Sequence, residues 1–460
     1  MDNKQISLEV VNPNAAGIDI GSRSHWVAVG QNAQDVEEFG VYSHDQLAMC
    51  EWLRSKGVTS IAMERTGTYW QNLFSTLVGQ GFDVILVNGR QTKNIKGKKT
   101  DIKDCQWIQK LHSLGLLSAS FLPDSDTDTI RTCSRHRNNL LNQAANCTKR
   151  MQKYLRLMNM RLDVVVRDIV GLTGQSIIKA FIGGEHSGRK LAKLRHFNCR
   201  KSEEEIEKAL QYNGRNDYLF ALTQEWDSYQ HLQLQIQNTD ARINQLLKDI
   251  IDKDNHKKQH VAERKPHKRK NKNGINNTDM NQISYQYFEG VDLMEIEGFN
   301  EALVMCLMSE AGVEGIKKFQ SAKQFASRLR LAPNNKISGG KVLSRHLPKG
   351  SSRLKIAFRN TTNAIGNLKE GWLVDFFKRI NYKKGREAAI SALARKLAVI
   401  VWNTAYLVRS TSMITGATKY TPPSRYLFLD EKRKLGIVKH IRKQIAKFDL
   451  SKEELGYAIA

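Results

Sequence analysis

Four acidic residues in the first quarter of the chain have the type and spacing for chemistry on phosphodiesters. Asp19 lies in the apolar run GIDIGS, where an unpaired carboxylate would be costly, and Glu64 lies in AMERTG, at the end of another apolar strand. Asp101 and Asp104 lie one helical turn apart, so both can face the same point. Carboxylates from two strand ends and a helix can hold two Mg²⁺ ions about 4 Å apart, which activate the nucleophile and stabilise the leaving oxygen. We therefore expect these four residues to be catalytic metal ligands.

A purely structural role for these carboxylates stays open. Asp in the first turn of a helix is favoured by the helix dipole, and a strand Asp often pairs with Arg or a backbone amide. The lysines around Asp101 favour the catalytic interpretation, because they would offset negative charge where a phosphate backbone arrives. These candidate nucleic-acid contacts are Lys96, Lys98, Lys99 and Lys103.

The strands and helices that must position the carboxylates are expected to form an α/β domain over residues 1–130. Apolar runs with strand character alternate with segments of helical spacing, joined by short connections. The expected strands are 15–22, 25–30, 60–67 and 82–89, and the expected helices are 44–57 and 69–81.

Residues 131–251 predict a helical middle part. Leu140, Ala144, Cys147 and Met151 alternate steps of four and three, and a second such series runs from Leu222 to Ile250. The spacing predicts an antiparallel coiled-coil arm that pairs subunits, with ordinary helical core as an open alternative.

The remaining chain divides into a linker and a mainly α-helical domain. Residues 252–283 are polar, basic and almost without apolar side chains, which predicts a flexible linker. That linker either contacts nucleic acid or serves only as a solvated tether. Residues 284–460 are mostly of helical pattern around one loop-rich centre.

Charge is the strongest global signal, at a formal net +26. Residues 1–130 hold 12 Lys/Arg and 15 Asp/Glu, a net of −3, and the rest holds 60 Lys/Arg and 31 Asp/Glu, a net of +29. This excess favours a nucleic-acid partner, with a basic membrane-surface protein as the lesser alternative. No run of eighteen apolar residues predicts a membrane span. Six cysteines without a CxxC pair, and an N-terminus unlike a signal peptide, predict a cytoplasmic protein.

Two parts of the sequence resemble one known family. The set Asp19, Glu64, Asp101 and Asp104 resembles the DEDD domain of transposases of the insertion-sequence 110/1111 family. That domain is similar to the RuvC Holliday-junction resolvase version of the ribonuclease-H fold. LAPNNKISGGKVLSRHLPKGSSRLK, residues 331–355, resembles the family's second domain, and FFKRINYKKGREAAISALARKLAVIVW, residues 376–402, resembles its closing helices. In GFN, Asn300 takes the place of a glycine usual in the family's helix–hairpin–helix turn.

The resemblance implies a serine nucleophile at Ser338, although its position beside two glycines also suits a simple turn residue. A covalent phosphoserine would conserve the bond energy of the cut strand. The implied active site combines this serine with the metal-bound carboxylates, in one subunit or between two. Basic residues that would hold neighbouring phosphates are Lys341, Arg345, Lys349 and Arg353.

The partners implied by the resemblance are double-stranded donor and target DNA, a structured guide RNA, and further copies of the chain in a dimer or tetramer. The implied location is the bacterial cytoplasm, in association with the nucleoid.

Three other functions remain open. One is a metal-dependent junction-type nuclease without covalent serine chemistry. Another is a sugar or acetate kinase of actin-like fold, because GIDIGS also resembles the first phosphate loop of those enzymes; a second Gly-rich phosphate loop is missing from this sequence. The last is a binding protein with structural carboxylates, which Mg²⁺ titration would distinguish.

Overall fold

The chain forms two compact units, Met1–Leu122 and Pro123–Ala460, in the computed structural model. The structure describes residues 9–65, 67–92, 100–255, 273–276, 278–288, 290–344, 346–350, 352–410 and 438. A long helix of the second unit begins at Ser125, where the Asp124 side chain caps it by accepting a hydrogen bond from the Thr127 amide at 2.8 Å.

A five-stranded mixed sheet forms the centre of the first unit in its described residues. The strands are β1 (Ala15–Ile20), β2 (Ser24–Ala28), β3 (Val36–Gly40), β4 (Ser60–Glu64) and β5 (Asp83–Val87), in the order β3-β2-β1-β4-β5. Strands β1, β2 and β3 pair antiparallel, whereas β4 runs parallel to both β1 and β5. This arrangement fits the predicted ribonuclease-H-like α/β domain. Strand β3, which follows the short helix η1 (Ala33–Asp35), was not predicted.

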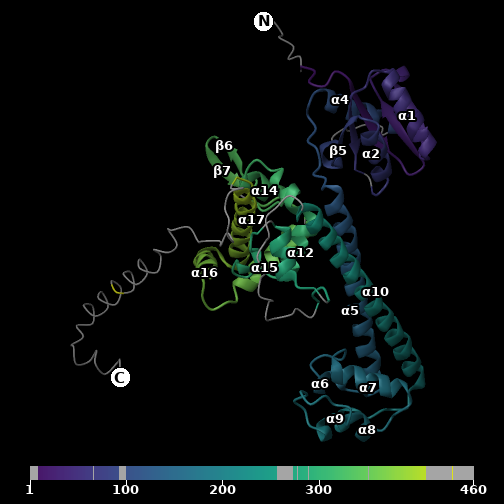
Figure 1. Ribbon diagram of the computed structural model, residues 1–460, viewed down its shortest axis with the longest axis vertical. Coiled ribbons are helices and arrows are strands. Elements are labelled where there is room, and N and C mark those ends of the chain that lie inside the picture. The colour runs from purple at the N-terminus through teal and green to yellow at the C-terminus, as the bar shows by residue number, and fades with distance from the viewer. Residues whose placement is uncertain are drawn as a thin grey trace. The chain divides into compact units, whose positions relative to one another are not determined.

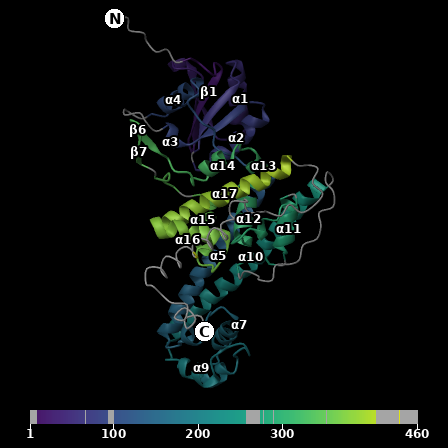
Figure 2. The same ribbon diagram turned by 90° about the vertical axis from the view of Figure 1, so that its left-hand side faces the viewer.

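Helices cover both faces of this sheet (Figure 2). Helices α1 (Ser43–Ser55) and α2 (Trp70–Gly79) share an apolar core with the β1 side chains Ile18 and Ile20. Helix α4 (Asp101–Ser113) packs over β1, β2 and β4 on the opposite face, which carries Gly17. The short helix α3 (Gly89–Thr92) follows β5.

Two long helices, α5 (Ser125–Leu157) and α10 (Asn216–Asn255), pack side by side in the second unit (Figure 1). They run antiparallel, because Arg137 pairs with Asp240 while Arg150, further along α5, pairs with Glu225 at 2.5 Å. The two helices share an apolar core made by residues of the two predicted heptad series. These residues are Leu140, Ala144, Cys147, Met151, Leu222, Trp226, Tyr229, Leu232 and Ile236. Coiled-coil geometry and pairing between subunits remain predictions.

Four shorter helices lie at the end of this helix pair where α5 ends and α10 begins (Figure 1). They are α6 (Leu162–Val165), α7 (Leu172–Ile182), α8 (Gly188–Ala192) and α9 (Glu203–Ala209).

The C-terminal part is mainly α-helical, as predicted. Its elements are α11 (Met280–Tyr287), η2 (Leu293–Glu295), α12 (Glu301–Glu310), α13 (Gly312–Lys317), α14 (Ala322–Arg328), β6 (Lys336–Ser338), β7 (Lys341–Ser344), α15 (Arg353–Ile365), α16 (Trp372–Lys384) and α17 (Arg386–Ser410). Helix α17 supplies core residues such as Leu393 and Leu397, and packs against α14, α15 and α16.

The predicted linker overlaps both neighbouring helices, because α10 continues to Asn255 and α11 begins at Met280. Residues 256–272 lie outside the described residues. In the part of the chain that the structure describes, no helix combines the length and apolar character that crossing a membrane requires.

Candidate functional site

Strand register places Asp19 and Glu64 on the same face of the sheet. The parallel register of β1 and β4 runs from Ala15 opposite Ser60 to Ile18 opposite Met63, so its next step sets Asp19 opposite Glu64. Side chains at matched positions of neighbouring strands point to the same face. Both carboxylates therefore lie at the carboxyl ends of parallel strands, where α/β sheets commonly bind ligands.

Helix α4 covers this same face. Gly17 has no side chain, which lets the α4 backbone at Cys105 and Gln109 lie against β1. The Gln109 amide Nε2 donates to the Ala15 carbonyl at 3.2 Å, and Ser60 Oγ lies 2.7 Å from His112 Nε2. The last half of α4 therefore contacts the beginnings of β1 and β4, so the helix runs opposite to both strands.

This antiparallel arrangement brings the first turn of α4 level with Asp19. The four strand steps from Ala15 to Asp19 span about 13 Å, and the eight helix steps from Gln109 back to Asp101 span about 12 Å. The four predicted carboxylates thus belong to one end of the sheet face that α4 covers. Asp104 is half-buried and Asp101 is exposed.

The charges of Asp19 and Asp104 both act on the thiol of Cys105, a buried residue of α4. Burial raises the pKa of the Cys105 thiol to about 12, and the negative charges of Asp19 and Asp104 contribute in the same direction. The thiol is therefore neutral at physiological pH, which disfavours Cys105 as a nucleophile or metal ligand.

Thr92, which the sequence analysis missed, holds the Glu64 carboxylate. Its hydroxyl Oγ1 donates to Glu64 Oε2 at 2.5 Å, while Trp107 Nε1 donates to the Thr92 carbonyl at 3.1 Å. Gly89 leaves room for the carboxylate, because a Cβ at that position would contact Glu64 Oε1. Glu64 is thus oriented by α3, which is in turn joined to α4.

The donor set suits a hard cation, since all four side chains offer carboxylate oxygens. Among the described residues, however, no three His, Cys, Asp or Glu side chains are grouped closely enough to hold a metal ion. Metal binding would have to draw the carboxylates of this face closer together.

The predicted basic residues of the first unit are only partly described. Lys96, Lys98 and Lys99 lie outside the described residues, whereas Lys103 is exposed on the first turn of α4. Thr100 caps this turn by accepting a hydrogen bond from the Lys103 amide at 3.3 Å. The Lys103 side chain is therefore available to a phosphate at the carboxylate end of α4.

Ser338 lies beside the turn of an exposed β-hairpin in the second unit. Strands β6 and β7 pair antiparallel with Ser338 opposite Lys341, and both side chains are exposed. Gly339 and Gly340 have φ angles of 53° and 74°, as a two-residue type I′ turn requires. The hairpin explains the two glycines as turn residues and leaves Ser338 accessible to a large substrate.

The basic residues after this hairpin differ in their surroundings. Arg345 lies outside the described residues, and Lys349 has an exposed side chain. The Lys349 carbonyl accepts a hydrogen bond from Arg330 Nη1 at 2.5 Å. Arg353 Nε lies 3.7 Å from Glu310 Oε1, so its charge is partly compensated.

Asn300 is the N-cap of α12, where its Oδ1 accepts a hydrogen bond from the Leu303 amide at 2.9 Å. The preceding Gly298 has a φ of 82°, and a Cβ there would overlap Ile365. The element before this turn is the single-turn helix η2. Asn300 therefore stabilises the start of a helix.

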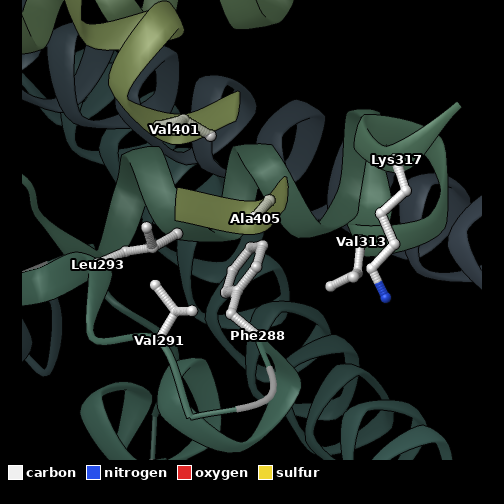
Figure 3. A pocket seen from close by; sticks show the side chains of 7 residues that line it. All are labelled: Phe288, Val291, Leu293, Val313, Lys317, Val401 and Ala405. Atoms are coloured by element: carbon white, nitrogen blue, oxygen red, sulfur yellow. The ribbon is translucent and has the colours of Figure 1, made fainter. Parts of the chain in front are cut away.

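A small cavity in the C-terminal core is too small for a ligand. Its volume is about 10 Å³, and Figure 3 shows its apolar walls with Lys317 at the edge. The lining side chains are Phe288, Val291, Leu293, Val313, Lys317, Val401 and Ala405. A space of this volume holds at most about one water molecule, so we regard it as a packing gap.

Two protein-family models match separate parts of the chain. A transposase model that carries the DEDD signature of IS110 matches residues 16–160, which include all four carboxylates. The model described as the transposase IS116/IS110/IS902 family matches residues 292–375, which include Ser338. The two matches define a DNA transposase. The chain belongs to the IS110 family, as predicted from its sequence. No curated protein matches it.

Proposed function

We propose that this transposase cuts and rejoins DNA strands with Asp19, Glu64, Asp101 and Asp104 as ligands of one or two Mg²⁺ ions. The observation that carries this proposal is the shared face of Asp19 and Glu64, covered by the helix whose first turn holds the other two carboxylates. Bound Mg²⁺ would stabilise the charge on the attacking and leaving oxygens of the phosphodiester.

The protein side chains orient the substrate and the ligands. Thr92 fixes one oxygen of Glu64, so this carboxylate is held in place before substrate arrives. Lys103 offsets the charge of the DNA backbone beside the carboxylates, and the exposed Asp101 leaves that end of α4 open to a phosphate. Lys96, Lys98 and Lys99 would extend the same contact.

Ser338 is the proposed nucleophile for strand cutting. Its Oγ would form a bond to phosphorus, the bond from phosphorus to a sugar oxygen would break, and the serine proton would pass to that leaving oxygen. Attack by a sugar hydroxyl on the phosphoserine would then restore a phosphodiester without ATP. Support comes from the family match over this segment and from the exposed hairpin that presents the serine, while Lys341, Arg345, Lys349 and Arg353 would hold adjacent phosphates.

The proposed partners are donor and target DNA, a structured guide RNA and further copies of the chain. The net charge of +29 after residue 130 provides for several nucleic-acid strands at once. The α5–α10 pair would assemble the subunits through surfaces other than the apolar faces that it already buries within one chain.

Metal binding and strand cutting together test the carboxylate assignment. We expect Asp19→Asn, Glu64→Gln, Asp101→Asn and Asp104→Asn to abolish cutting and to reduce the rise in unfolding temperature that Mg²⁺ gives the wild-type chain. Glu51→Gln, at an exposed position of α1, is the control that keeps both properties. Undiminished strand exchange by Asp104→Ala would remove Asp104 from the set.

A further inference from the structure

A groove in the second unit has a volume of about 830 Å³. It lies between α15, α16, α17 and the segments that flank the β6–β7 hairpin, and we call it the α16–α17 groove. Its lining residues are Leu331, Pro333, His346, Leu347, Arg359, Arg379, Ile380, Lys383, Lys384, Glu387, Ala388, Ser391, Ala392 and Arg395. This volume far exceeds that of a single small anion and is sufficient for part of a polymer.

Positive charge dominates the lining. It contains the five cations Arg359, Arg379, Lys383, Lys384 and Arg395, against the carboxylate of Glu387. Within the described ranges, no carboxylate lies at ion-pair distance from any of these five side chains. An uncompensated net charge of +4, with His neutral, requires an anionic occupant or bulk counterions.

Helices α16 and α17 supply most of the lining residues. Arg379, Lys383 and Lys384 recur at helical spacing on one side of α16, which aligns them along its axis. On α17 the small side chains of Ala388 and Ala392 follow the same spacing and leave room for a backbone to approach.

Arg359 of α15 is held in place within the lining. Its Nη1 donates to Ser391 Oγ at 2.8 Å, which joins α15 to α17. Burial lowers the pKa of the nearby Lys355 ammonium group, and repulsion by the charges of Arg359 and Arg330 lowers it further. A row of phosphates would relieve this repulsion.

We propose that the α16–α17 groove binds the sugar–phosphate backbone of the DNA on which the transposase acts. The inference rests on the proposed function, which supplies DNA as the polyanion, and it adds a contact surface beyond Lys341, Arg345, Lys349 and Arg353. Cations of α15, α16 and α17 without a carboxylate partner among the described residues, beside the small side chains of α17, suit contacts to the phosphates rather than reading of base edges.

The salt dependence of DNA binding tests this groove in the full chain. We compare Arg379→Gln/Lys383→Gln/Lys384→Gln with Lys149→Gln/Lys179→Gln/Lys248→Gln, because all six residues are exposed and both variants lose three charges. Each lost phosphate contact reduces the slope of log K against log salt by about 0.9 on duplex DNA. We expect the groove variant to lose about 2 to 3 in slope and the control variant less than about 1.

A variant that makes the groove more positive distinguishes an effect of charge on DNA binding from a folding defect. Glu387→Gln removes the acidic group of the groove and should tighten duplex DNA binding by about two- to fivefold, which a damaged fold would not do. Equal slopes for the two triple variants, or no gain from Glu387→Gln, would overturn the groove assignment.

The same salt-dependence measurement with RNA of equal length tests whether the groove binds DNA or RNA phosphates. A slope loss confined to RNA would overturn the assignment to DNA. Failure of the wild-type chain to bind or cut DNA would instead refute the proposed function, so the two failures are distinguishable.

Discussion

Arg137 and Asp240 form an ion pair buried between α5 and α10, with 8% and 1% of their surfaces exposed. Arg137 also donates from Nη1 and Nη2 to the carbonyls of Asn273 and Gly274 at 3.0 and 2.7 Å, and the Asn276 amide donates to Asp240 Oδ2 at 3.0 Å. One buried pair therefore joins both long helices to the segment that leads into the C-terminal part.

Breaking this pair from one side should destabilise the second unit strongly. Asp240→Ala leaves the Arg137 guanidinium buried without its counter-charge, and we expect a loss of about 3 to 5 kcal/mol in urea unfolding. Arg137→Met/Asp240→Leu removes both charges and should recover most of that loss. The control Asp217→Ala breaks the exposed pair with Arg215 and should leave the unfolding midpoint nearly unchanged. Equal effects of Asp240→Ala and Asp217→Ala would contradict this role.

Gly17 sets the distance between β1 and α4. A methyl group there overlaps the α4 backbone at Cys105 and Gln109, so Gly17→Ala should push the helix away and cost about 1 to 3 kcal/mol in unfolding. Because α4 carries Asp101 and Asp104, DNA cutting should fall even where the chain is still folded. Gly79→Ala, at the end of α2 with open space around its Cβ, should leave cutting unchanged. Full activity of folded Gly17→Ala would refute this positioning.

Thr92 should act on strand cutting through Glu64. Thr92→Val removes the donor to Glu64 Oε2 at nearly the same volume, and we expect about tenfold slower cutting with a higher Mg²⁺ requirement. Thr92→Ser restores a hydroxyl and should recover most of the rate. If Thr92→Val needs no more Mg²⁺ than the wild-type chain, the threonine has only a packing role.

The first unit should lose stability in mild acid. Burial lowers the pKa values of His25 and His112 below the usual value near 6.5, although Asp83 partly opposes this at His112. The unfolded chain then binds protons more readily, so stability is complete above about pH 6.5 and falls as the pH decreases below it.

Variants without these two imidazoles test that effect. His25→Phe/His112→Gln should flatten the dependence of unfolding on pH between about pH 8 and pH 5, monitored by amide exchange in β1 and β4. Glutamine at residue 112 can still hydrogen-bond to Ser60 Oγ. An unchanged pH profile in this variant would assign the acid sensitivity to other groups.

Ser338→Ala should separate DNA binding from covalent chemistry. The exposed strand position accepts alanine, so we expect unchanged DNA affinity and no protein–DNA adduct after denaturation. Ser344→Ala, in the paired strand β7, is the matched control and should still form the adduct. An adduct in Ser338→Ala would eliminate this serine, and wild-type cutting without any adduct would favour a nuclease.

Apolar patterning predicted most of the first unit, because the sequences of β1, β2, β4 and β5 consist mostly of apolar residues. Strand β3 was not predicted, because its sequence VEEFG carries two exposed glutamates. The strand lies at the edge of the sheet. Helix α5 begins at Ser125, because the capping side chain of Asp124 precedes the first apolar residues of the helix.

Contacts between distant residues explain what sequence patterning could not provide. The convergence of Asp19 and Glu64 depends on the β1–β4 register, and the role of Thr92 depends on how α3 folds back to Glu64. The α16–α17 groove combines Arg359 with residues of two later helices, and its cations are indistinguishable by type from other Lys and Arg of this basic chain. Helix spacing alone also could not tell packing within one chain from pairing between chains.

The helices α6 to α9 form an insertion between α5 and α10 whose two ends lie close together. Asn213 donates from Nδ2 to the Leu157 carbonyl at 3.0 Å and from its amide to the Met158 carbonyl at 3.2 Å. The insertion thus begins and ends at the same place. A short turn could replace residues 159–212 without redirecting α5 or α10, and a foreign domain whose termini lie close together could be grafted there. This junction offers an attachment point for a reporter, or for new chain ends made by circular permutation.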